Sequence, residues 1–404
     1  MEPVRDVIVV GGGPAGSTAA FLLAELGHDV LLLDAARFPR DKVCGESVSP
    51  GAWRVLDSLG AAASLRHAGA REVAGMRLVA PNGVSFEGVY RDGRVCGFAL
   101  ERRLLDAQLL DRARGLRVEV RENARVAGLL RDGPAVTGVR VADASGGDQP
   151  LRARLVVAAD GRRSRIAREL GLLREARWPR RFAVRGYWNG VEGLSSFGEM
   201  HVGGGGYCGV APLATTRANV TFVLDQRAMT PAGGDLESFY RDRLRRWPRL
   251  AERLARAQLE EPPTAIGPLA LESSGAWAPG VLLVGDAAGF FDPFTGEGIS
   301  AALRGAEQAA EVGHGFLRER MTLAEYGRRH RRLVGQKFRF NRVVQRLIAR
   351  DGLANVAAYV ISRLPAAANA LVDVAGDCLS DLGPARNALS CRMASPELRP
   401  RIRP

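Results

Sequence analysis

The sequence predicts an α/β fold in which a parallel sheet is interrupted by a mostly antiparallel sheet and followed by helices. Three observations support this fold class. Residues 7–34 read as strand, glycine-rich turn, helix and second strand. Continuous apolar runs of the kind buried in parallel sheets recur at Leu155–Ala159 and Val281–Val284. Residues 178–274 instead carry mainly alternating segments, and the pattern beyond residue 320 is helical.

The first element is a strand followed directly by a glycine-rich turn. Val7–Val10 is β-branched and apolar, and Gly11–Gly16 then fits the spacing G-x-G-x-x-G. Small and apolar residues continue at helical spacing to Leu26, where Gly27 supplies a C-terminal stop. A second apolar strand follows and ends on Asp34.

Each residue type in this turn has a physical role. Gly11 permits a tight turn, Gly13 lets a pyrophosphate approach the backbone, and Gly16 lets the helix lie close to the strand. The helix N-terminus that follows this turn offers free N–H groups and a partial positive charge to phosphates. Asp34 is placed to bond the ribose hydroxyls of an adenosine. The order of these elements predicts a bound dinucleotide.

Composition places the chain among ordinary globular enzymes. It has 404 residues, of which 46% are hydrophobic and 25% charged, so two or three domains are expected. The net charge of +13 suits anionic cofactors or acidic membrane surfaces, but no nucleic-acid-binding module is present. Five scattered cysteines without C-x-x-C spacing predict neither a disulfide framework nor a metal site. The nucleotide strand follows the N-terminus too closely for a signal peptide, and we expect a cytoplasmic protein.

A polar loop, residues 37–50, follows the second strand. Loops at the carboxyl end of an α/β sheet commonly hold ligands. Cys44 stands between Lys42 and Glu46, and two interpretations stay open. In the first, the neighbouring cation stabilises the thiolate form of Cys44. In the second, Cys44 is a small packed thiol.

The next segments alternate between the two sheets. Residues 76–79 and 84–86 predict a hairpin that begins the second sheet, and Glu101–Arg114 predicts a helix. Short strands are expected at 117–120, 124–130 and 136–141. The strand at Leu155–Ala159 then returns to the first sheet and runs into Asp160.

A second strong motif follows the antiparallel region. The strand Val281–Val284 ends on Gly285-Asp286, and Gly296–Gly298 precedes a helix from Ile299. A carboxylate at a strand end can hold polyol hydroxyls, as in the ribityl chain of a flavin. Backbone N–H groups at the helix start favour negative charge on the edge of a reduced flavin ring.

These motifs allow a domain division. We expect a discontinuous nucleotide domain at 1–177 and 275–335, with residues of about 70–100 contributing to the second sheet. The substrate domain is expected at 178–274, and a helical C-terminal region at 336–404.

Three motifs together resemble one family. Gly11–Gly16 with Asp34, Asp160-Gly161-x-x-Ser164, and Gly285-Asp286 with Pro293 and Gly296-x-Gly298 occur in the family's order. That FAD-dependent family includes para-hydroxybenzoate-type hydroxylases, geranylgeranyl reductases and flavin-dependent halogenases. The resemblance implies a Rossmann-like FAD-binding domain of the glutathione-reductase type, and a role for the Asp-Gly motif in binding FAD and NAD(P)H.

Within this family, the loop Arg40-x-Lys42-x-Cys44-Gly45-Glu46 resembles the geranylgeranyl reductase branch, in which it lies near the flavin. The resemblance also implies that Arg102 touches the cofactor and that Asp286 bonds the ribityl chain. The residues expected to bind FAD are Gly11, Gly13, Pro14, Ala15, Gly16, Asp34, Arg40, Lys42, Arg102, Asp160, Gly285, Asp286, Pro293, Gly296, Gly298 and Ile299.

The resemblance implies a hydride transfer from reduced FAD to an unsaturated centre of an apolar, isoprenoid- or polyketide-like metabolite. The alternative is a monooxygenase that hydroxylates or epoxidises its substrate with O2 and NAD(P)H. A non-catalytic flavin-binding protein is a weaker hypothesis. A halogenase is weaker still, because the resemblance implies a lysine that carries the halogenating oxidant, and no lysine lies between Lys42 and Lys337. The sequence carries one dinucleotide fingerprint, which is assigned to FAD. We therefore expect that NAD(P)H binds transiently or that a separate reductase supplies the electrons.

Three residues are candidates for catalysis. Cys44 and Tyr207 are expected to donate a proton, with Glu46 tuning them. The segment Tyr207–Pro212 places Gly209 and Ala211 where the reductase branch has bulky residues, which predicts a reshaped cavity. His201 is expected to be structural.

The C-terminal helical region leaves two interpretations open. Lys337–Ile348 alternates arginines with apolar residues, and Val356–Leu364 is strongly apolar. These helices pack against the FAD domain, or they make a peripheral contact with an anionic membrane or form the mouth for a lipid-like substrate.

Overall fold

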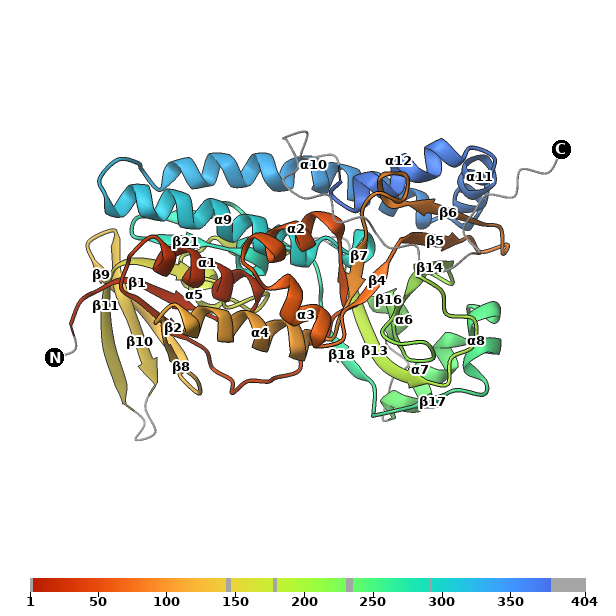
Figure 1. Cartoon of the computed structure of the whole chain (residues 1–404), viewed down its shortest axis with the longest axis horizontal. Coiled ribbons are helices and arrows are strands. Elements are labelled where there is room, and N and C mark those ends of the chain that lie inside the picture. The colour runs from red at the N-terminus through yellow and green to blue at the C-terminus, as the bar shows by residue number, and fades with distance from the viewer. Residues whose placement is uncertain (1–2, 143–146, 177–179, 230–234, 291, 379–404) are drawn as a thin grey trace.

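The structure is a computed structural model that describes residues 3–142, 147–176, 180–229, 235–290 and 292–378. Within these residues the chain forms two large sheets, and a layer of helices runs along both of them (Figure 1). The first sheet is mainly parallel and the second mainly antiparallel, which confirms the predicted α/β fold class.

The first sheet has the strand order β20-β21-β11-β1-β2-β8, with the β9–β10 hairpin extending β11. β1 lies between β11 and β2 and is parallel to both, so that Val9 is opposite Val157 and Leu32. The strands are β1 (Arg5–Val10), β2 (Val30–Leu33), β8 (Glu119–Arg121), β9 (Val126–Asp132), β10 (Ala135–Ala142), β11 (Asp148–Ala158), β20 (Trp277–Ala278) and β21 (Val281–Leu283).

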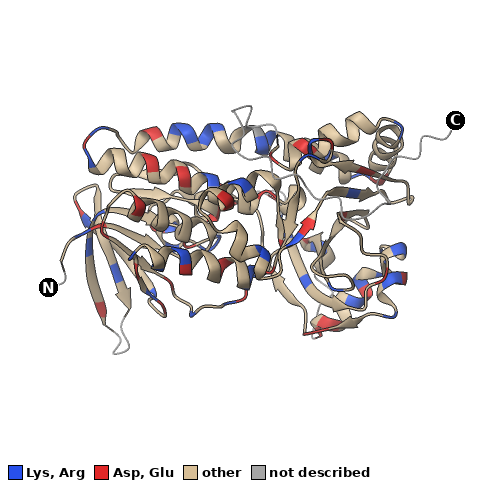
Figure 2. Ribbon diagram, viewed as in Figure 1, with Lys and Arg blue, Asp and Glu red and all other residues tan. Residues whose placement is uncertain are grey.

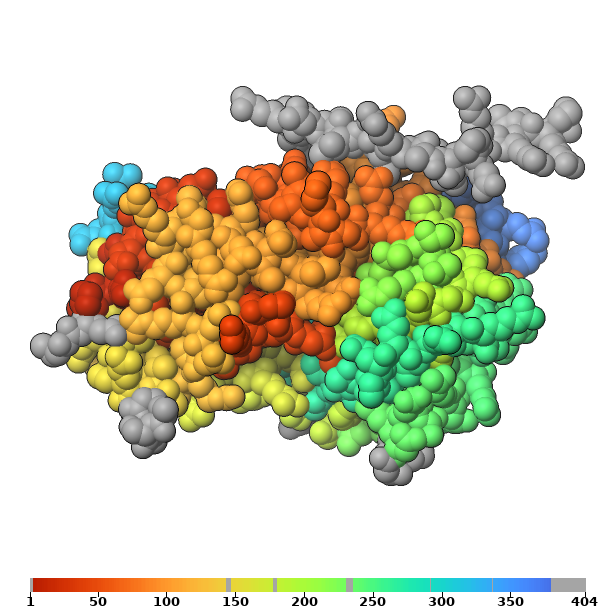
Figure 3. All heavy atoms as spheres, turned by 60° about the horizontal axis from the view of Figure 1, so that its bottom comes forward, coloured from red at the N-terminus to blue at the C-terminus, as the bar shows by residue number. Residues whose placement is uncertain are grey.

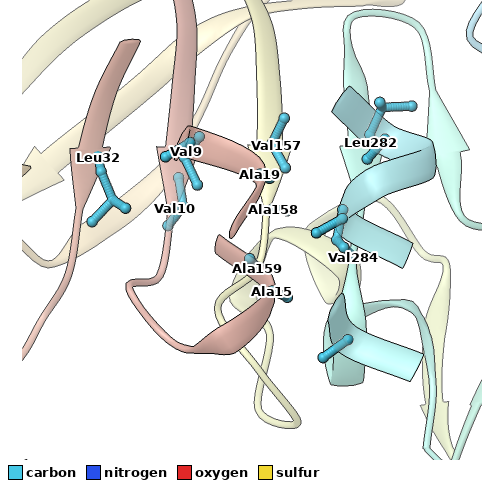
Figure 4. Packing of buried hydrophobic residues seen from close by; sticks show 14 of the residues in the cluster. Val9, Val10, Ala15, Ala19, Leu32, Val157, Ala158, Ala159, Leu282 and Val284 are labelled. Carbon is cyan, nitrogen blue, oxygen red and sulfur yellow. The ribbon is translucent and has the colours of Figure 1, made fainter. Parts of the chain in front are cut away.

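Apolar side chains on both faces explain why this sheet is buried. Figure 4 shows Val9, Leu32 and Val157 on adjacent strands, and all three are fully buried. Parallel strands need cover on both faces, and here α1 (Pro14–Glu25) packs against α4 (Arg102–Gly115) and α9 (Gly298–Leu317). The carboxyl ends of the strands are therefore the edge at which a ligand can bind.

The second sheet has the order β17-β13-β16-β15-β14-β5-β6, and β18 also pairs with β13. All its pairs are antiparallel except β14 with β5. Residues 75–89 supply two of its strands, within the region from which a contribution was expected. The strands are β5 (Gly75–Val79), β6 (Ser85–Val89), β13 (Arg181–Asn189), β14 (Phe197–Gly203), β15 (Gly206–Pro212), β16 (Ala218–Asp225), β17 (Gln258–Leu259) and β18 (Thr264–Ile266).

Smaller elements connect the two sheets. Residues 236–254 form two helices, because Pro248 starts a new helix after the chain turns at Trp247. The elements are α2 (Pro50–Ser58), α3 (Ala62–His67), α5 (Arg165–Glu169), α6 (Gln226–Met229), α7 (Leu236–Leu244), α8 (Pro248–Leu254), and the short strands β3 (Ser47–Val48), β4 (Arg71–Val73), β7 (Gly97–Ala99), β12 (Leu173–Glu175) and β19 (Leu271–Ser273).

Three helices follow α9 and reach from the first sheet to the second. α10 (Ala324–Ile348) packs against α9, whereas α11 (Asp351–Ser362) and α12 (Pro365–Ala375) pack against β6 (Figure 1). These helices account for the described part of the expected helical region 336–404, and residues 379–404 lie outside the described residues. Among the described helices, none combines the length and the apolar character needed to cross a membrane.

Candidate active site

A cleft of about 770 Å³ lies where the two sheets meet. The carboxyl ends of β1, β2, β11 and β21 bring Gly11, Asp34, Asp160 and Asp286 to it. Although Gly11 and Asp286 are far apart in the sequence, they line one continuous space. Its volume falls within the range of about 300–1,000 Å³ that is usual for ligand and cofactor sites.

The glycine turn has the close backbone approaches that its sequence predicts. Gly11 has φ +101°, and a Cβ atom there would lie 2.3 Å from the carbonyl oxygen of Ala159. A Cβ atom on Gly16 would lie 1.7 Å from the carbonyl oxygen of Gly11. Gly16 therefore sets the distance between α1 and the strands, whereas Gly11, Gly13, Pro14 and Ala15 line the cleft.

Two guanidinium groups converge beside Gly13. A Cβ atom on Gly13 would lie 3.4 Å from Nη2 of Arg40 and 4.0 Å from Nη2 of Arg102. Asp106 orients both arginines, accepting from Nε and Nη2 of Arg102 at 2.8 Å each and lying 3.2 Å from Nη1 of Arg40. Free N–H groups at the start of α1 face the same space. This donor set fits the pyrophosphate of a dinucleotide.

Asp34 is held in place at the end of β2. Its Oδ2 accepts the backbone N–H of Gly12 at 2.6 Å, and its Oδ1 accepts that of Ala36 at 2.8 Å. These bonds fix the carboxylate at the adenosine end of the cleft, in the position expected for a ribose partner.

The opposite end of the cleft combines a carboxylate with a helix N-terminus. Gly285, Asp286, Pro293, Gly296, Gly298 and Ile299 all line it. Gly296 has φ +69°, a left-handed conformation that glycine adopts without strain, and α9 then starts at Gly298. Exposed backbone N–H groups and a positive helix end are therefore available to an anionic edge of a flavin ring.

Asp160 lines the cleft directly after β11, and the start of α5 holds its carboxylate. Its Oδ2 accepts the backbone N–H of Arg165 at 2.9 Å. Its Oδ1 is buried and has no hydrogen-bond partner among the described residues.

The loop from Arg40 to Glu46 connects the two sheets. Arg185 of β13 is almost completely buried and donates from Nη1 and Nη2 to the two carboxylate oxygens of Asp41, both at 2.8 Å. The ammonium group of Lys42 lies 3.5 Å from Oδ2 of Asp286. In the space-filling view, the red early part of the chain reaches the green part that contains the second sheet (Figure 3). The loop therefore encloses the cleft from the side of β2.

We expect Asp41→Asn to lower the free energy of unfolding by about 1 kcal/mol, because the buried Arg185 loses a charged bidentate partner whose own side chain is half-exposed. Chemical denaturation of the flavin-loaded protein measures this change. The control is Asp132→Asn, at the exposed end of β9, which should change stability by less than about 0.5 kcal/mol. Equal effects of the two substitutions would contradict the proposed anchoring of the loop.

Glu46 is the buried centre of a polar cluster beneath this loop. Its carboxylate accepts the hydroxyl of Tyr187 at 2.5 Å, the side-chain amide of Asn219 at 3.1 Å and the backbone N–H of Arg102 at 3.0 Å. Burial raises the pKa of Glu46, and these three donors oppose the rise. The cluster also fixes Cys44, whose Sγ accepts the N–H of Glu46 at 3.3 Å and whose carbonyl accepts Asn219 at 2.9 Å.

Tyr207 directs its hydroxyl away from the open cleft. The hydroxyl donates to Oδ1 of Asp292 at 2.6 Å, and the side-chain amide of Gln345 from α10 donates to the same oxygen at 2.7 Å. Burial and the Asp292 carboxylate raise the pKa of Tyr207 well above its usual value. The roles assigned to Cys44, Glu46 and Tyr207 in catalysis stay predictions. His201 pairs with Glu199 at 2.8 Å, as expected for a structural side chain.

The sequence did not reveal the apolar half of the cleft. The alternating pattern of a strand or the amphipathic pattern of a helix predicts which of its faces is buried. It does not predict which buried faces lie opposite each other across a cleft. The side chains that form this half come from β5, β6, β14, β15 and the helices α10–α12, together with Phe294. They are Met76, Leu78, Phe86, Met200, Val202, Tyr207, Phe294, Phe340, Val344, Leu347, Ile348, Ala354, Ala357, Ala358, Ile361, Leu371 and Val372.

Comparisons with known proteins agree with this site. Residues 5–336 match the family model described as an FAD binding domain. The chain is 34% identical over 342 residues to digeranylgeranylglycerophospholipid reductase 2 of Methanopyrus kandleri, covering 80% of this chain and 81% of that protein. It is 33% identical over 331 residues to the menaquinone reductase of Mycolicibacterium smegmatis, covering 77% of each.

Solved structures show the same fold. The myxobacterial chondrochloren halogenase superposes with a TM-score of 0.82 at 24% identity, covering 96% of this chain and 99% of that chain. A flavin-dependent brominase gives a TM-score of 0.83 at 19% identity, covering 94% and 95%. At these identities the halogenases establish the fold and not the reaction. The chain belongs to the FAD-binding domain family, and it is an FAD-dependent oxidoreductase.

Proposed function

We propose that this enzyme reduces an unsaturated centre in an apolar, isoprenoid-like substrate. The observation that carries the proposal is the division of one cleft into two chemically different halves. The half beside Gly13 and Asp34 presents charges and backbone N–H groups that fit FAD, which supplies hydride transfer when bound. The other half, between β14 and α10, is apolar and suits a hydrocarbon chain.

The named relatives support this choice. Proteins that are 33–34% identical to most of this chain are named as reductases of a digeranylgeranylglycerophospholipid and of menaquinone. The halogenases match at lower identity, and their likeness extends to the fold alone.

Cys44 is the proton donor that the geometry favours. Reduction of an alkene requires a hydride at one carbon and a proton at the other, so the enzyme needs an acidic hydrogen beside the substrate. Cys44 lines the cleft next to the guanidinium of Arg102, on the loop that separates the two halves. The hydroxyl of Tyr207, by contrast, is bound to Asp292 in a buried cluster. Glu46 then acts as a positioning residue through its backbone N–H to Cys44.

NAD(P)H is the proposed source of electrons, binding transiently because the sequence carries one dinucleotide fingerprint. A separate reductase protein is the other source. Rapid mixing of the oxidised enzyme with NADPH or NADH distinguishes them, since direct donation bleaches the flavin absorbance without a partner.

Anaerobic turnover tests the proposed reaction. With a geranylgeranyl-containing lipid or menaquinone and chemically reduced enzyme, we expect a product that forms in the absence of O2 and stays two hydrogens heavier after reoxidation in air, which returns a quinol to the quinone but leaves a reduced alkene unchanged. A product that forms only with O2 and gains an oxygen atom would replace the reductase by the monooxygenase. A flavoprotein that transforms no substrate in either atmosphere would contradict both.

Replacing Cys44 with alanine should lower the single-turnover rate of flavin reoxidation by substrate about 100-fold or more, because the proton donor is lost. The flavin content should be unchanged. Cys96→Ala is the matched control, since Cys96 is also half-buried but is not among the residues that line the cleft. An unchanged rate in the Cys44 variant would dismiss its role as proton donor.

A further inference from the structure

We propose that the outer face of α10 and α11 docks on an anionic lipid bilayer. The exposed side of α10 carries Arg339, Arg342, Val343, Arg346 and Leu347, and Arg350 follows in the turn before α11. Spacings of three and four residues place them along one side of the helix. Val343 is 55% exposed and Leu347 38% exposed, although both are large and apolar.

The outer face of α11 continues this surface with more apolar side chains. Leu353, Val356 and Val360 recur at helical spacing, and Val356 is 63% exposed. Tyr359 is also exposed, and the guanidinium of Arg363 lies 4.4 Å from its ring centre. Among the described residues, seven of the eleven exposed large hydrophobic side chains fall between 343 and 364. Such a concentration marks an interaction surface.

The charge of this surface identifies the partner. Residues 338–364 contain five arginines and a single acidic residue, Asp351. Figure 2 shows blue basic bands along α10. An apolar helix face flanked by arginines is the pattern of helices that lie in the interface of an anionic membrane. A second copy of the chain would place like charges opposite each other, so the bilayer is the better match.

The inner faces of the same helices explain the purpose of docking. Phe340, Val344 and Ile348 of α10 and Ile361 of α11 line the apolar half of the cleft. Leu347 both lines the cleft and is partly exposed, so a single layer of helices separates the cleft from the outer surface. A docked enzyme can therefore take an apolar substrate directly from the bilayer. This last step rests on the proposed function, whereas the docking does not.

Vesicle flotation of the full-length, flavin-loaded protein tests the docking without any substrate. We expect the protein to float with vesicles of phosphatidylcholine containing about 30% phosphatidylglycerol, and to float far less with phosphatidylcholine alone. About 0.5 M NaCl should release most of it, because salt screens the arginines.

Two sets of variants separate the apolar and the electrostatic contributions. Val343→Glu combined with Val356→Glu should abolish flotation, because two charges replace the exposed apolar contact. Arg339→Gln, Arg346→Gln and Arg350→Gln together should lower partitioning about 100-fold. The controls are Val4→Glu, at a valine that is 61% exposed at the other end of the molecule, and Arg131→Gln with Arg152→Gln. Retained flavin and an unchanged melting temperature show that each variant is folded.

Two results would overturn the proposal. One is flotation of the α10–α11 variants equal to that of the controls. The other is a dimer in solution that the same variants dissociate, which would assign the surface to a second copy of the chain. The docking proposal would be supported if the α10–α11 variants no longer floated but still turned over a detergent-dispersed substrate normally under anaerobic conditions. An inactive enzyme that floats as expected would reject the proposed reaction and leave the docking intact.

Discussion

Replacing Gly16 with alanine is expected to yield a protein without flavin and with a free energy of unfolding lowered by on the order of 4 kcal/mol. The added Cβ would lie 1.7 Å from the carbonyl oxygen of Gly11 and 3.2 Å from Cβ of Ala159. A rotamer change cannot relieve this clash, because the nearest atom belongs to the backbone. α1 must move away from the strands, and the phosphate cradle at Gly13 moves with it.

The ratio of flavin to protein absorbance and a denaturation curve measure the two effects. Gly335→Ala is the matched control, because Gly335 is also helical and a Cβ there meets no atom within 4 Å. This control should keep its flavin and gain up to about 1 kcal/mol from its better helix propensity. A Gly16 variant that remained yellow and equally stable would contradict the close packing of α1.

Replacing Asp292 with alanine is expected to lower the free energy of unfolding by about 3–5 kcal/mol. Asp292 accepts from Tyr207 and Gln345 at 2.6 and 2.7 Å and lies 3.3 Å from Nη1 of Arg181. Those partners come from β15, α10 and β13. Without the carboxylate, the buried hydroxyl of Tyr207 loses its acceptor, the guanidinium of Arg181 loses its buried counter-ion, and α10 loses one of its contacts with the second sheet.

Asp225→Ala is the control within the same ion-pair network. Oδ1 of Asp225 lies 3.0 Å from Nε of Arg181, but the Asp225 side chain is 56% exposed, whereas that of Asp292 is fully buried. Exposed ion pairs contribute little to folding stability. Asp225→Ala should therefore lower the free energy of unfolding, measured by urea denaturation, by less than about 1 kcal/mol. Similar losses in both variants would show that burial does not decide the strength of this cluster.

The sequence predicted the parts of the site that depend on local structure. Gly11, Gly16 and Asp34 owe their positions to one strand–turn–helix unit, and the pattern of that unit is visible in a short stretch. Asp286 was predictable in the same way, because it follows a buried strand directly. Their meeting in one cleft follows from the rule that parallel strands share their carboxyl edge.

The parts that depend on contacts between distant elements were not predictable. Tyr187 and Asn219 appear in the sequence as ordinary residues of alternating strands, yet both donate to Glu46. Asp292 lies within the second motif, but nothing local shows that Arg181 and Gln345 converge on it. A polar residue in an otherwise apolar strand was the available clue, and it does not identify the partner.

The attachment of Asp41 to Arg185 has a consequence for cofactor exchange. The loop that carries Arg40 to the cleft is tied to the second sheet by this pair, so an opening of the loop must first break two charged hydrogen bonds. We expect FAD to be released faster once the pair is removed. The rate of FAD release in the Asp41 variant would therefore report how far this pair limits cofactor exchange.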